Sequence, residues 1–226
     1  MQKSIIITSD GSHSIEIPGM QVTYHSLHGA IQESRHVFIE AGLNYFLTQN
    51  PGKPQYAVFE MGLGTGLNAL LTLETANRVQ QKMVYEAIEA FPLEEIIVQQ
   101  LNYCNVLNQP ALATAFNQLH TCPWNEIVSI SPWFSFKKIN ADLTRLTTTQ
   151  QFHLIYYDAF APDAQPELWT ETIFQQLSGL LLPGGIIVTY SSKGSVRRAM
   201  QAAGFRVEKL PGPKGKREMI RAIKPV

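Results

Sequence analysis

The stretch Tyr56-Ala-Val-Phe-Glu-Met-Gly-Leu-Gly-Thr-Gly66 decides the fold of this chain. Its first four residues form an apolar run typical of a buried strand, and the helix-forming segment Leu67-Asn-Ala-Leu-Leu-Thr-Leu73 follows. Glycines at alternate positions, Gly62, Gly64 and Gly66, let the backbone turn sharply and approach a ligand closely. The sequence therefore predicts a strand, a glycine turn and a helix whose free N–H groups face a bound cofactor.

The spacing of the glycines narrows the class of cofactor. A dinucleotide-binding turn has the spacing GxGxxG and a P-loop carries a lysine after its glycines, and this stretch has neither. GLGTG with the acid Glu60 two residues ahead resembles motif I of class I S-adenosylmethionine (SAM) methyltransferases. The methionine carboxylate of SAM can use the helix N-terminus. We therefore expect Glu60, Gly62, Gly64 and Gly66 to bind SAM.

Length and composition fit a single globular domain. The chain has 226 residues, of which 45% are hydrophobic. The apolar run after Met1 is too short for a secretion signal, and no stretch approaches the roughly 20 residues that span a bilayer. A cytoplasmic protein with no membrane segment is expected. Cys104 and Cys122 lack metal-ligand spacing, so we interpret both as structural thiols and expect no metal.

Charge is unevenly distributed, although the whole chain carries 18 basic and 18 acidic residues. Residues 193–226 contain ten basic residues and two acids, Glu208 and Glu218, a formal charge of +8 that the rest of the chain balances. Clustered lysine and arginine favour an anionic partner because binding releases phosphate counterions. A solvated helix face followed by a charged tail is the alternative.

Apolar runs bounded by turn residues alternate with helix-like stretches over most of the chain, as in βαβ units of a mostly parallel sheet. Expected strands cover residues 56–60, 83–89, 126–131, 134–139, 152–158, 185–190, 206–210 and 218–223, the third and fourth pairing as a hairpin. Expected helices cover residues 66–80, 92–103, 110–120, 166–182 and 195–203. The pattern predicts an α/β, Rossmann-like class I methyltransferase fold with helices on both faces of the sheet.

The first fifty residues have a different pattern. Residues 8–24 alternate apolar and polar side chains between glycines, as short antiparallel strands do, and residues 32–47 look helical. We expect a small β-rich and helical extension or lid over residues 1–50, and the methyltransferase domain over residues 51–226. The roles of Tyr24, Glu33, Ser34 and Arg35 stay open between shaping the cofactor pocket and simple packing.

Two acids follow strands at positions where SAM needs them. Glu89 ends the second strand of the methyltransferase unit, where a carboxylate can accept hydrogen bonds from both ribose hydroxyls. Asp142 follows the strand at 134–139, where an acid reaches the adenine amino group; capping a helix is the alternative for this aspartate. Both are predicted cofactor ligands.

The stretch Leu154-Ile-Tyr-Tyr-Asp-Ala-Phe-Ala-Pro162 is a buried strand ending in a carboxylate and a proline turn. The carboxyl edge of an open parallel sheet lines the ligand crevice, so Asp158 and Phe160 are expected to face the methyl group of the cofactor. The arrangement is similar to the Asp-Pro-Pro-Tyr turn of amine methyltransferases. Asp158 is thus a predicted catalytic and cofactor-contacting residue, and Phe160 a predicted aromatic that stacks on a base.

Several stretches together resemble the bacterial tRNA 5-aminomethyl-2-thiouridine methyltransferases, the free-standing MnmD enzymes and the methyltransferase half of bifunctional MnmC. They are GLGTGLNALL, YEAIEAFPL, YYDAFAPDAQPELW, SSKGSVRRAMQAAGF and GPKGKREM, with SRHVF near the start. The resemblance implies SAM-dependent N-methylation of the 5-aminomethyl group of (2-thio)uridine at the tRNA wobble position, giving 5-methylaminomethyl-(2-thio)uridine. Its implied partner is the anticodon loop of tRNA.

The resemblance also assigns residues. The family's glycine loop falls on Glu60, Gly62, Gly64 and Gly66, its ribose acid on Glu89, and its catalytic Asp-x-Phe on Asp158 and Phe160. The bifunctional members carry a flavin oxidase as well. This chain ends at Val226 with no second dinucleotide motif, so we expect the oxidase step to be absent.

The nucleophile implied by this family is a primary alkyl amine, which has a pKa of about 10 in water and is therefore protonated. Burial against Phe160 and Trp169 disfavours the ammonium, whereas the Asp158 carboxylate favours it. We therefore expect Asp158 chiefly to position the amine and less to accept its proton. The candidates for tRNA phosphate contacts are the basic residues Lys193, Arg197, Arg198, Lys214, Lys216 and Arg217.

Other functions remain as alternatives. A spermidine-synthase-like aminopropyltransferase shares the fold but needs an acidic polyamine channel, which the basic C-terminal segment opposes. A small-molecule amine methyltransferase does not require that segment, and a non-catalytic binding module has no need for Asp158 beside a glycine turn. A dehydrogenase is consistent only with Glu89 as the ribose acid of NAD, and the glycine spacing opposes it.

Overall fold

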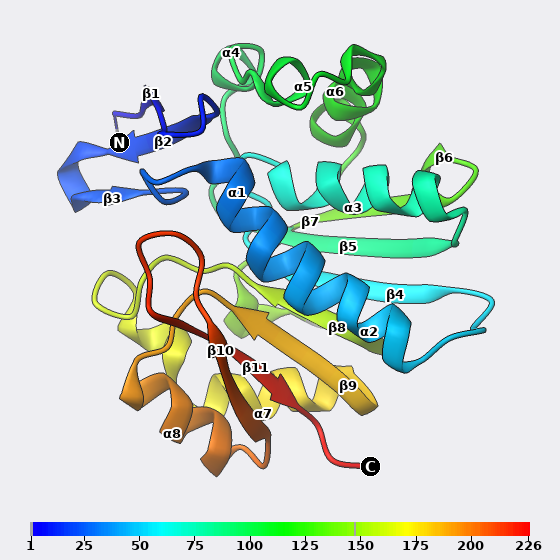
Figure 1. Cartoon of the computed structure of the whole chain (residues 1–226), viewed down its shortest axis with the longest axis vertical. Helices are drawn as coiled ribbons and strands as arrows, with labels where there is room; N and C mark the ends of the chain where they lie inside the picture. Colours follow the sequence, from blue (N-terminus) through cyan, green and yellow to red (C-terminus); the bar gives the residue numbers. More distant parts are fainter. Residues whose placement is uncertain (1, 147) are drawn as a thin grey trace.

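A computed structural model describes residues 2–146 and 148–226. Within these residues the central sheet has eight strands in the order β10-β11-β9-β8-β4-β5-β7-β6 (Figure 1). Their bounds are β4 (Tyr56–Met61), β5 (Met83–Glu89), β6 (Val128–Ser131), β7 (Phe134–Asn140), β8 (Phe152–Tyr157), β9 (Leu181–Thr189), β10 (Arg206–Pro211) and β11 (Glu218–Ile223). The strands β9, β8, β4, β5 and β7 are mutually parallel, while β6, β11 and β10 pair antiparallel. The predicted α/β fold is confirmed.

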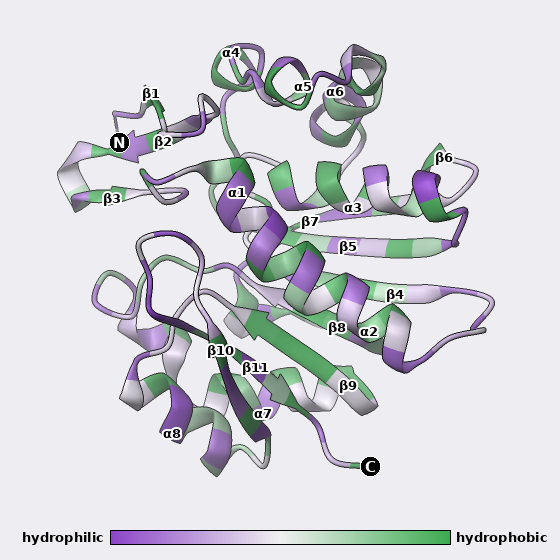
Figure 2. Ribbon diagram, viewed as in Figure 1, coloured by the Kyte–Doolittle hydropathy of each residue, from purple (hydrophilic) through white to green (hydrophobic). Residues whose placement is uncertain are grey.

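Helices cover both faces of this sheet. Those after the glycine turn are α3 (Leu67–Val79), α4 (Glu95–Val98), α5 (Tyr103–Val106), η3 (Pro110–Leu112), α6 (Ala113–Thr121), η4 (Leu143–Arg145), η5 (Pro166–Trp169), α7 (Glu171–Leu180) and α8 (Gly194–Ala202). The first hydrophobic cluster contains α3, α5 and α6, and the second contains α7 and α8. Side chains of β4 alternate between the clusters: Tyr56 and Val58 join the first, Ala57 and Phe59 the second. Burial on both faces explains why the central strands are mostly apolar, as the green arrowhead half of β9 in Figure 2 shows.

The N-terminal residues form a three-stranded antiparallel sheet and a long helix. The strands are β1 (Ser4–Ile7), β2 (His13–Ile17) and β3 (Val22–Thr23), with the 3-10 turn η1 (Pro18–Met20). The helix comprises α1 (Ala30–Ser34), the π-helical stretch η2 (Arg35–Asn44) and α2 (Tyr45–Gln49). Phe38 and Leu43 are buried in the same cluster as β4 and β8, and a Cβ on Gly42 would lie 3.0 Å from Val188. This helix therefore packs on the central sheet, and the division at residue 50 stays a prediction.

Three predicted elements differ from the structure. The helix expected at 92–103 is wrong: α4 and α5 are separate short helices, because Asn102 leaves the helical path to bond the backbone of Gly11 and His13 at 2.9 and 2.8 Å. The helix expected at 166–182 starts anew at Glu171, where Thr170 caps its N-terminus. The strand expected at 185–190 begins earlier, at Leu181, since the glycines after Pro183 are absorbed into β9. The hairpin β6–β7 is confirmed, and so are the two strands expected at 206–210 and 218–223, which pair with each other as β10 and β11.

None of the helices in the two described ranges has the length and the hydropathy that crossing a bilayer requires.

Candidate active site

The glycine loop joins β4 to α3 in a conformation that suits glycine. Gly62, Gly64 and Gly66 have φ of +85°, +51° and +74°, in the left-handed region that other residues disfavour. The loop is held by the next strand, because the N–H groups of Gly62 and Leu63 both donate to the Ile88 carbonyl at 3.1 Å. The helix α3 begins at Leu67, so its first N–H groups point toward the carboxyl edge of the sheet. The structure confirms the predicted strand, turn and helix.

The buried His25 and the partly buried His120 both contact this loop, and sequence reasoning did not single them out. The ring of His25 bonds the Thr65 hydroxyl at 2.8 Å, and the ring of His120 bonds the Thr65 carbonyl at 3.2 Å. Burial lowers the pKa of both histidines to about 4, so both rings are neutral near pH 7. A Cβ on Gly66 would lie 2.7 Å from His120, which leaves no room for a larger residue. The signal is weak in sequence, since these histidines come from segments far from the loop.

Glu60 precedes the loop and is fully buried in β4. Neither of its carboxyl oxygens has a hydrogen-bond partner within the described residues. Burial raises the pKa of Glu60 well above its ordinary value, which favours the neutral acid. A neutral carboxyl group can both donate and accept a hydrogen bond at this edge of the sheet. Its predicted role in binding the cofactor is a proposal.

Glu89 ends β5 and faces the glycine loop. Its carboxylate accepts hydrogen bonds from the N–H of Gly64 at 2.9 Å and from the N–H of Phe91 at 2.8 Å. Tyr24 covers the same point: a Cβ on Gly64 would lie 3.1 Å from the Tyr24 ring. Burial raises the pKa of Tyr24, and Glu89 adds to that increase. The structure thus brings Tyr24, whose role was open, into the pocket beside the predicted ribose acid.

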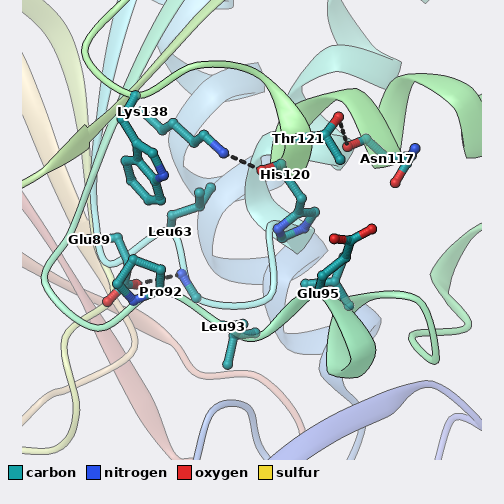
Figure 3. Close-up of a pocket in the computed structure, with 12 residues that line it drawn as sticks. Leu63, Glu89, Pro92, Leu93, Glu95, Asn117, His120, Thr121 and Lys138 are labelled. Atoms are coloured by element: carbon teal, nitrogen blue, oxygen red, sulfur yellow. Dashed lines mark hydrogen bonds between the residues drawn. The ribbon is translucent and has the colours of Figure 1, made fainter.

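Two hollows adjoin the end of β5. A cavity of about 230 Å³ lies between Glu89 and α6 (Figure 3), and its wall includes His120, Trp124 and Lys138. The Lys138 ammonium donates to the His120 carbonyl and lies 4.4 Å from the centre of the Trp124 ring. The second hollow, of about 370 Å³, is lined by residues that follow β5 and β7, Asp142 among them. Asp142 also caps η4 by accepting from the Thr144 N–H at 2.7 Å, so the capping alternative is observed and the adenine contact stays a prediction.

Asp158 follows β8 directly beside the glycine loop. The N–H of Asp158 donates to the Met61 carbonyl at 3.2 Å. A Cβ on Gly62 would lie 3.3 Å from the carbonyl oxygen of Asp158. One carboxyl oxygen accepts from the Asn68 amide at 2.9 Å. Burial raises the pKa of Asp158 to about 7, and Glu33 adds to the increase. The carboxyl group is therefore held in place, and its pKa lies near neutral pH.

Asn68 is the positioning residue that sequence reasoning missed. It is 2% exposed and occupies the second position of α3, in the otherwise apolar run Leu67-Asn-Ala-Leu-Leu71. A polar residue within such a run, directly after the glycines, is the available signal. Its amide leaves the second oxygen of Asp158 available to a ligand.

Phe160 lies at the turn after Asp158 and packs against the pocket. Its ring contacts Tyr24 edge-on at 5.2 Å between centroids. The indole N–H of Trp169 donates to the Phe160 carbonyl at 2.8 Å, and the Trp169 ring packs edge-on against Tyr157 at 5.0 Å. Trp169 therefore stabilises the turn through its contacts with the Phe160 carbonyl and the Tyr157 ring, whereas sequence reasoning placed it against the substrate. The aromatic stacking role of Phe160 stays a prediction.

The predicted phosphate-binding residues divide into two groups. Arg198, Lys214 and Arg217 are exposed and form no salt bridge among the residues that the structure describes. The others are less free: Lys193 pairs with Asp163, Lys216 pairs with Glu33 at 2.6 Å, and the Nε of Arg197 is buried. Lys216 points toward the pocket of Asp158 and is 32% exposed. Contact with tRNA remains a prediction for all six.

The remaining undecided residues also divide. Glu33 is 7% exposed and lies close enough to Asp158 to raise its pKa, so it belongs to the pocket. Ser34 is buried without a hydrogen-bond partner in the described ranges, and Arg35 pairs with Glu74 of α3 at 3.6 Å. Arg35 thus links the N-terminal helix to α3, and the role of Ser34 stays open.

A family model for S-adenosyl-L-methionine-dependent methyltransferases matches residues 113–225, half of the chain. The chain belongs to this family. The matched range contains the Asp158 turn and Asp142, and the glycine loop of the methyltransferase lies upstream of it. SAM is accordingly its methyl donor.

Named relatives extend this comparison. The bifunctional tRNA 5-methylaminomethyl-2-thiouridine biosynthesis protein MnmC of Magnetococcus marinus is 31% identical over 228 residues, which cover 93% of this chain and 33% of that protein. Its counterpart in Actinobacillus pleuropneumoniae is 28% identical over 223 residues, covering 89% of this chain and 32% of that protein. The chain thus spans about a third of the length of these relatives. The crystal structure of MNMC2 from Aquifex aeolicus has the same fold, with a TM-score of 0.80 at 24% identity over 100% of this chain and 72% of that one.

The pocket of the methyltransferase fits its donor. The three glycines with positive φ leave room that side chains would fill, and the start of α3 presents free N–H groups suited to a carboxylate. Glu89 offers a carboxylate at the end of β5. Asp158 and Phe160 close the opposite side, after β8. The Glu89 carboxylate and the backbone of Asp158 both contact the glycine loop, so these residues meet at the carboxyl edge of the sheet, where ligands of this fold bind.

Proposed function

We propose that this methyltransferase transfers a methyl group to the primary amine of 5-aminomethyl-(2-thio)uridine at the wobble position of tRNA, and that it works in the cytoplasm. The observation that carries the proposal is the Asp158 carboxyl group, fixed by Asn68 beside the glycine loop and followed by Phe160. The names of the MnmC relatives, which concern the biosynthesis of 5-methylaminomethyl-2-thiouridine in tRNA, support the choice of substrate.

In this proposal one set of residues binds SAM, and Asp158 positions the substrate amine. Glu60, Gly62, Gly64, Gly66, Glu89 and Asp142 hold SAM, which supplies an electrophilic methyl group on a sulfonium whose C–S electrons stay on sulfur. Asp158 accepts a hydrogen bond from the substrate amine and aims its lone pair, since in-line attack needs the reacting atoms about 3 to 3.5 Å apart. With a pKa of about 7, the Asp158 carboxyl group can also take the proton that the amine gives up.

Recognition of the substrate follows from the surroundings of that carboxyl group. A wobble base lies in a single-stranded loop, from which a protein can splay it out and stack an aromatic side chain on it. Phe160 is the aromatic beside Asp158 and is partly exposed. Arg198, Lys214 and Arg217 provide exposed positive charge for phosphates of the anticodon stem and loop. Aminopropyl transfer is not favoured, because the chain belongs to a methyltransferase family.

The test uses tRNA from cells that lack the endogenous enzyme, a labelled methyl donor and nucleoside mass spectrometry. The wild-type chain should convert the aminomethyl nucleoside to its methylaminomethyl form. Asp158→Ala should retain SAM binding in titration calorimetry and lose methyl transfer to tRNA. Methylation of small amines but not of tRNA would favour a small-molecule methyltransferase, and unchanged turnover of Asp158→Ala would remove the role of this residue.

A further inference from the structure

The loop between β10 and β11, residues 212–217, carries a lysine into the active site. The loop lies near α1 in Figure 1, and it contacts the segment just before that helix: a Cβ on Gly215, whose φ is +87°, would overlap the ring of His28. The His36 ring also bonds the Pro211 carbonyl at 2.8 Å. These contacts fix the path of the loop, so the inward direction of Lys216 follows from the fold.

The Lys216 ammonium lies between a carboxylate and an aromatic ring. The ammonium lies 2.6 Å from an oxygen of Glu33 and 3.9 Å from the centre of the Tyr190 ring. The second Glu33 oxygen accepts from the Ser26 N–H at 3.0 Å. The Tyr190 hydroxyl donates to the Ala159 carbonyl at 2.8 Å, which places Lys216 close to the Asp158 turn.

The charges around this turn pose a problem for amine methylation. A substrate amine has a pKa of about 10 in water, and its ammonium form has no lone pair to attack with. Both Asp158 and Glu33 are carboxyl groups, and a nearby negative charge stabilises the ammonium further. Desolvation opposes them, but a neighbouring cation is the direct way to lower the pKa of an amine.

We propose that Lys216 is that cation, a residue of the active site that keeps the substrate amine neutral and nucleophilic; the inference rests on the proposed function. Burial raises the pKa of Asp158 to about 7, Glu33 adds to this, and Lys216 opposes it, so its charge reaches the place where the amine binds. Among the described residues Lys216 is the one cation with this effect on Asp158.

Other titratable and charged groups facing this cluster do not take the role. They are Tyr24, His25 and His28 of the N-terminal segment, Glu33 of α1, Glu60 of β4, Asp158 after β8, Tyr190 after β9, and Lys214 and Arg217 of the same loop. Burial lowers the pKa of His25 to about 4 and raises the pKa of Glu60 and of Tyr190, so these three are neutral near pH 7. Lys214 and Arg217 are exposed.

The protons and electrons of the step balance without a further reactant. The substrate ammonium first gives a proton to Asp158 or to solvent. The freed lone pair forms the N–C bond as the C–S bond breaks, and the secondary ammonium product then loses a proton. Lys216 takes no part in these proton transfers and acts by charge alone. The negative charge of Glu33 partly offsets the effect of Lys216 on the pKa of the substrate amine.

The test measures single-turnover methyl transfer against pH, from about pH 6 to 10, on the aminomethyluridine tRNA at saturating tRNA and SAM. In the wild type the rate should rise with pH as the substrate amine loses its proton, and this rise is the ascending limb of the pH–rate profile. Lys216→Gln should move the ascending limb to higher pH. The rate at pH 7 should then fall about tenfold for each pH unit that the limb moves, and it should recover at alkaline pH. Glu33→Gln, which preserves the bond to Ser26, should move the limb to lower pH. The double variant should return it close to the wild-type position, and Lys216→Arg should keep it there.

Opposite displacements of the limb are the signature, because loss of a merely structural ion pair damages both single variants alike. Arg217→Gln, which removes a neighbouring exposed charge, should leave the limb in place although it weakens tRNA binding. If the ascending limb does not move, or moves in the same direction for Lys216→Gln and Glu33→Gln, the role of Lys216 is refuted and the proposed function still stands. A wild-type chain that transfers no methyl group to this tRNA overturns the proposed function and the inference with it. If Lys216→Gln fails to unfold cooperatively, the pH profile of Glu33→Gln decides.

Discussion

Replacing Asp158 by asparagine should stabilise the protein in a pH-dependent way. Burial raises the pKa of this carboxyl group to about 7 from an ordinary value of 3.8. The folded state therefore binds more protons than the unfolded state between these two values, and the stability of the wild type falls as the pH rises through them. At about 1.36 kcal/mol for each pH unit between the two pKa values, the carboxylate costs at most about 4 kcal/mol above pH 7 and about 2 kcal/mol at pH 5. Asparagine removes that cost.

The assay is urea unfolding of the wild type and of Asp158→Asn at about pH 5 and pH 8.5. The amide oxygen of the new asparagine can still accept from Asn68, so the hydrogen bond at 2.9 Å is kept. The variant should be more stable at both values, with a gap that widens by about 2 kcal/mol at the higher pH. The control is Asp163→Asn, which removes an 83% exposed carboxylate close in sequence and should show little such widening.

An equal difference in unfolding free energy at the two pH values would contradict this reasoning, as would a variant that is less stable at pH 8.5. Asp158→Asn should also slow methyl transfer strongly, because a neutral amide oxygen is a weaker acceptor for the substrate amine than a carboxylate and therefore positions the amine less well. Such a combination, higher stability with reduced activity, is expected of a functional carboxyl group that is largely shielded from solvent.

Two further predictions concern the loop and the charged surface. Gly66→Ala places a Cβ 2.7 Å from the His120 ring at a φ of +74°, so it should lower the free energy of unfolding by about 1 to 3 kcal/mol and weaken SAM binding in calorimetry; wild-type affinity would show that the loop tolerates a side chain. Arg217→Gln should weaken tRNA binding and reduce the slope of log Kd against log salt by about one; an unaltered slope would mean that Arg217 touches no phosphate.

Much of the fold follows from neighbours in the sequence. The apolar run before Glu60, the glycines at alternate positions and the helix after Gly66 specify a strand, a turn and a helix through local sterics, and the structure has all three. The hairpin β6–β7 and a strand at 152–158, observed as Phe152–Tyr157, were predicted on the same grounds. The predicted helices at 92–103 and 166–182 were wrong in extent because Asn102 and Thr170 make contacts that outweigh propensity.

The candidate site was predictable as far as its acids end strands. Glu89 and Asp158 follow β5 and β8, and parallel strands bring their carboxyl ends to one edge, where the Glu89 carboxylate and the backbone of Asp158 contact the glycine loop. Asn68 escaped prediction because its partner Asp158 lies 90 residues further along the chain.

Local sequence is enough to specify the α/β pattern, the glycine loop and the acids at the ends of strands, because each depends on residues within one turn or one strand. The tertiary structure alone decided that Lys216 points inward to Glu33, 183 residues away, while Arg217 beside it faces solvent. The physical reason is that the direction of a loop side chain depends on contacts made after the chain has folded, here those of the β10–β11 loop with His28 and His36.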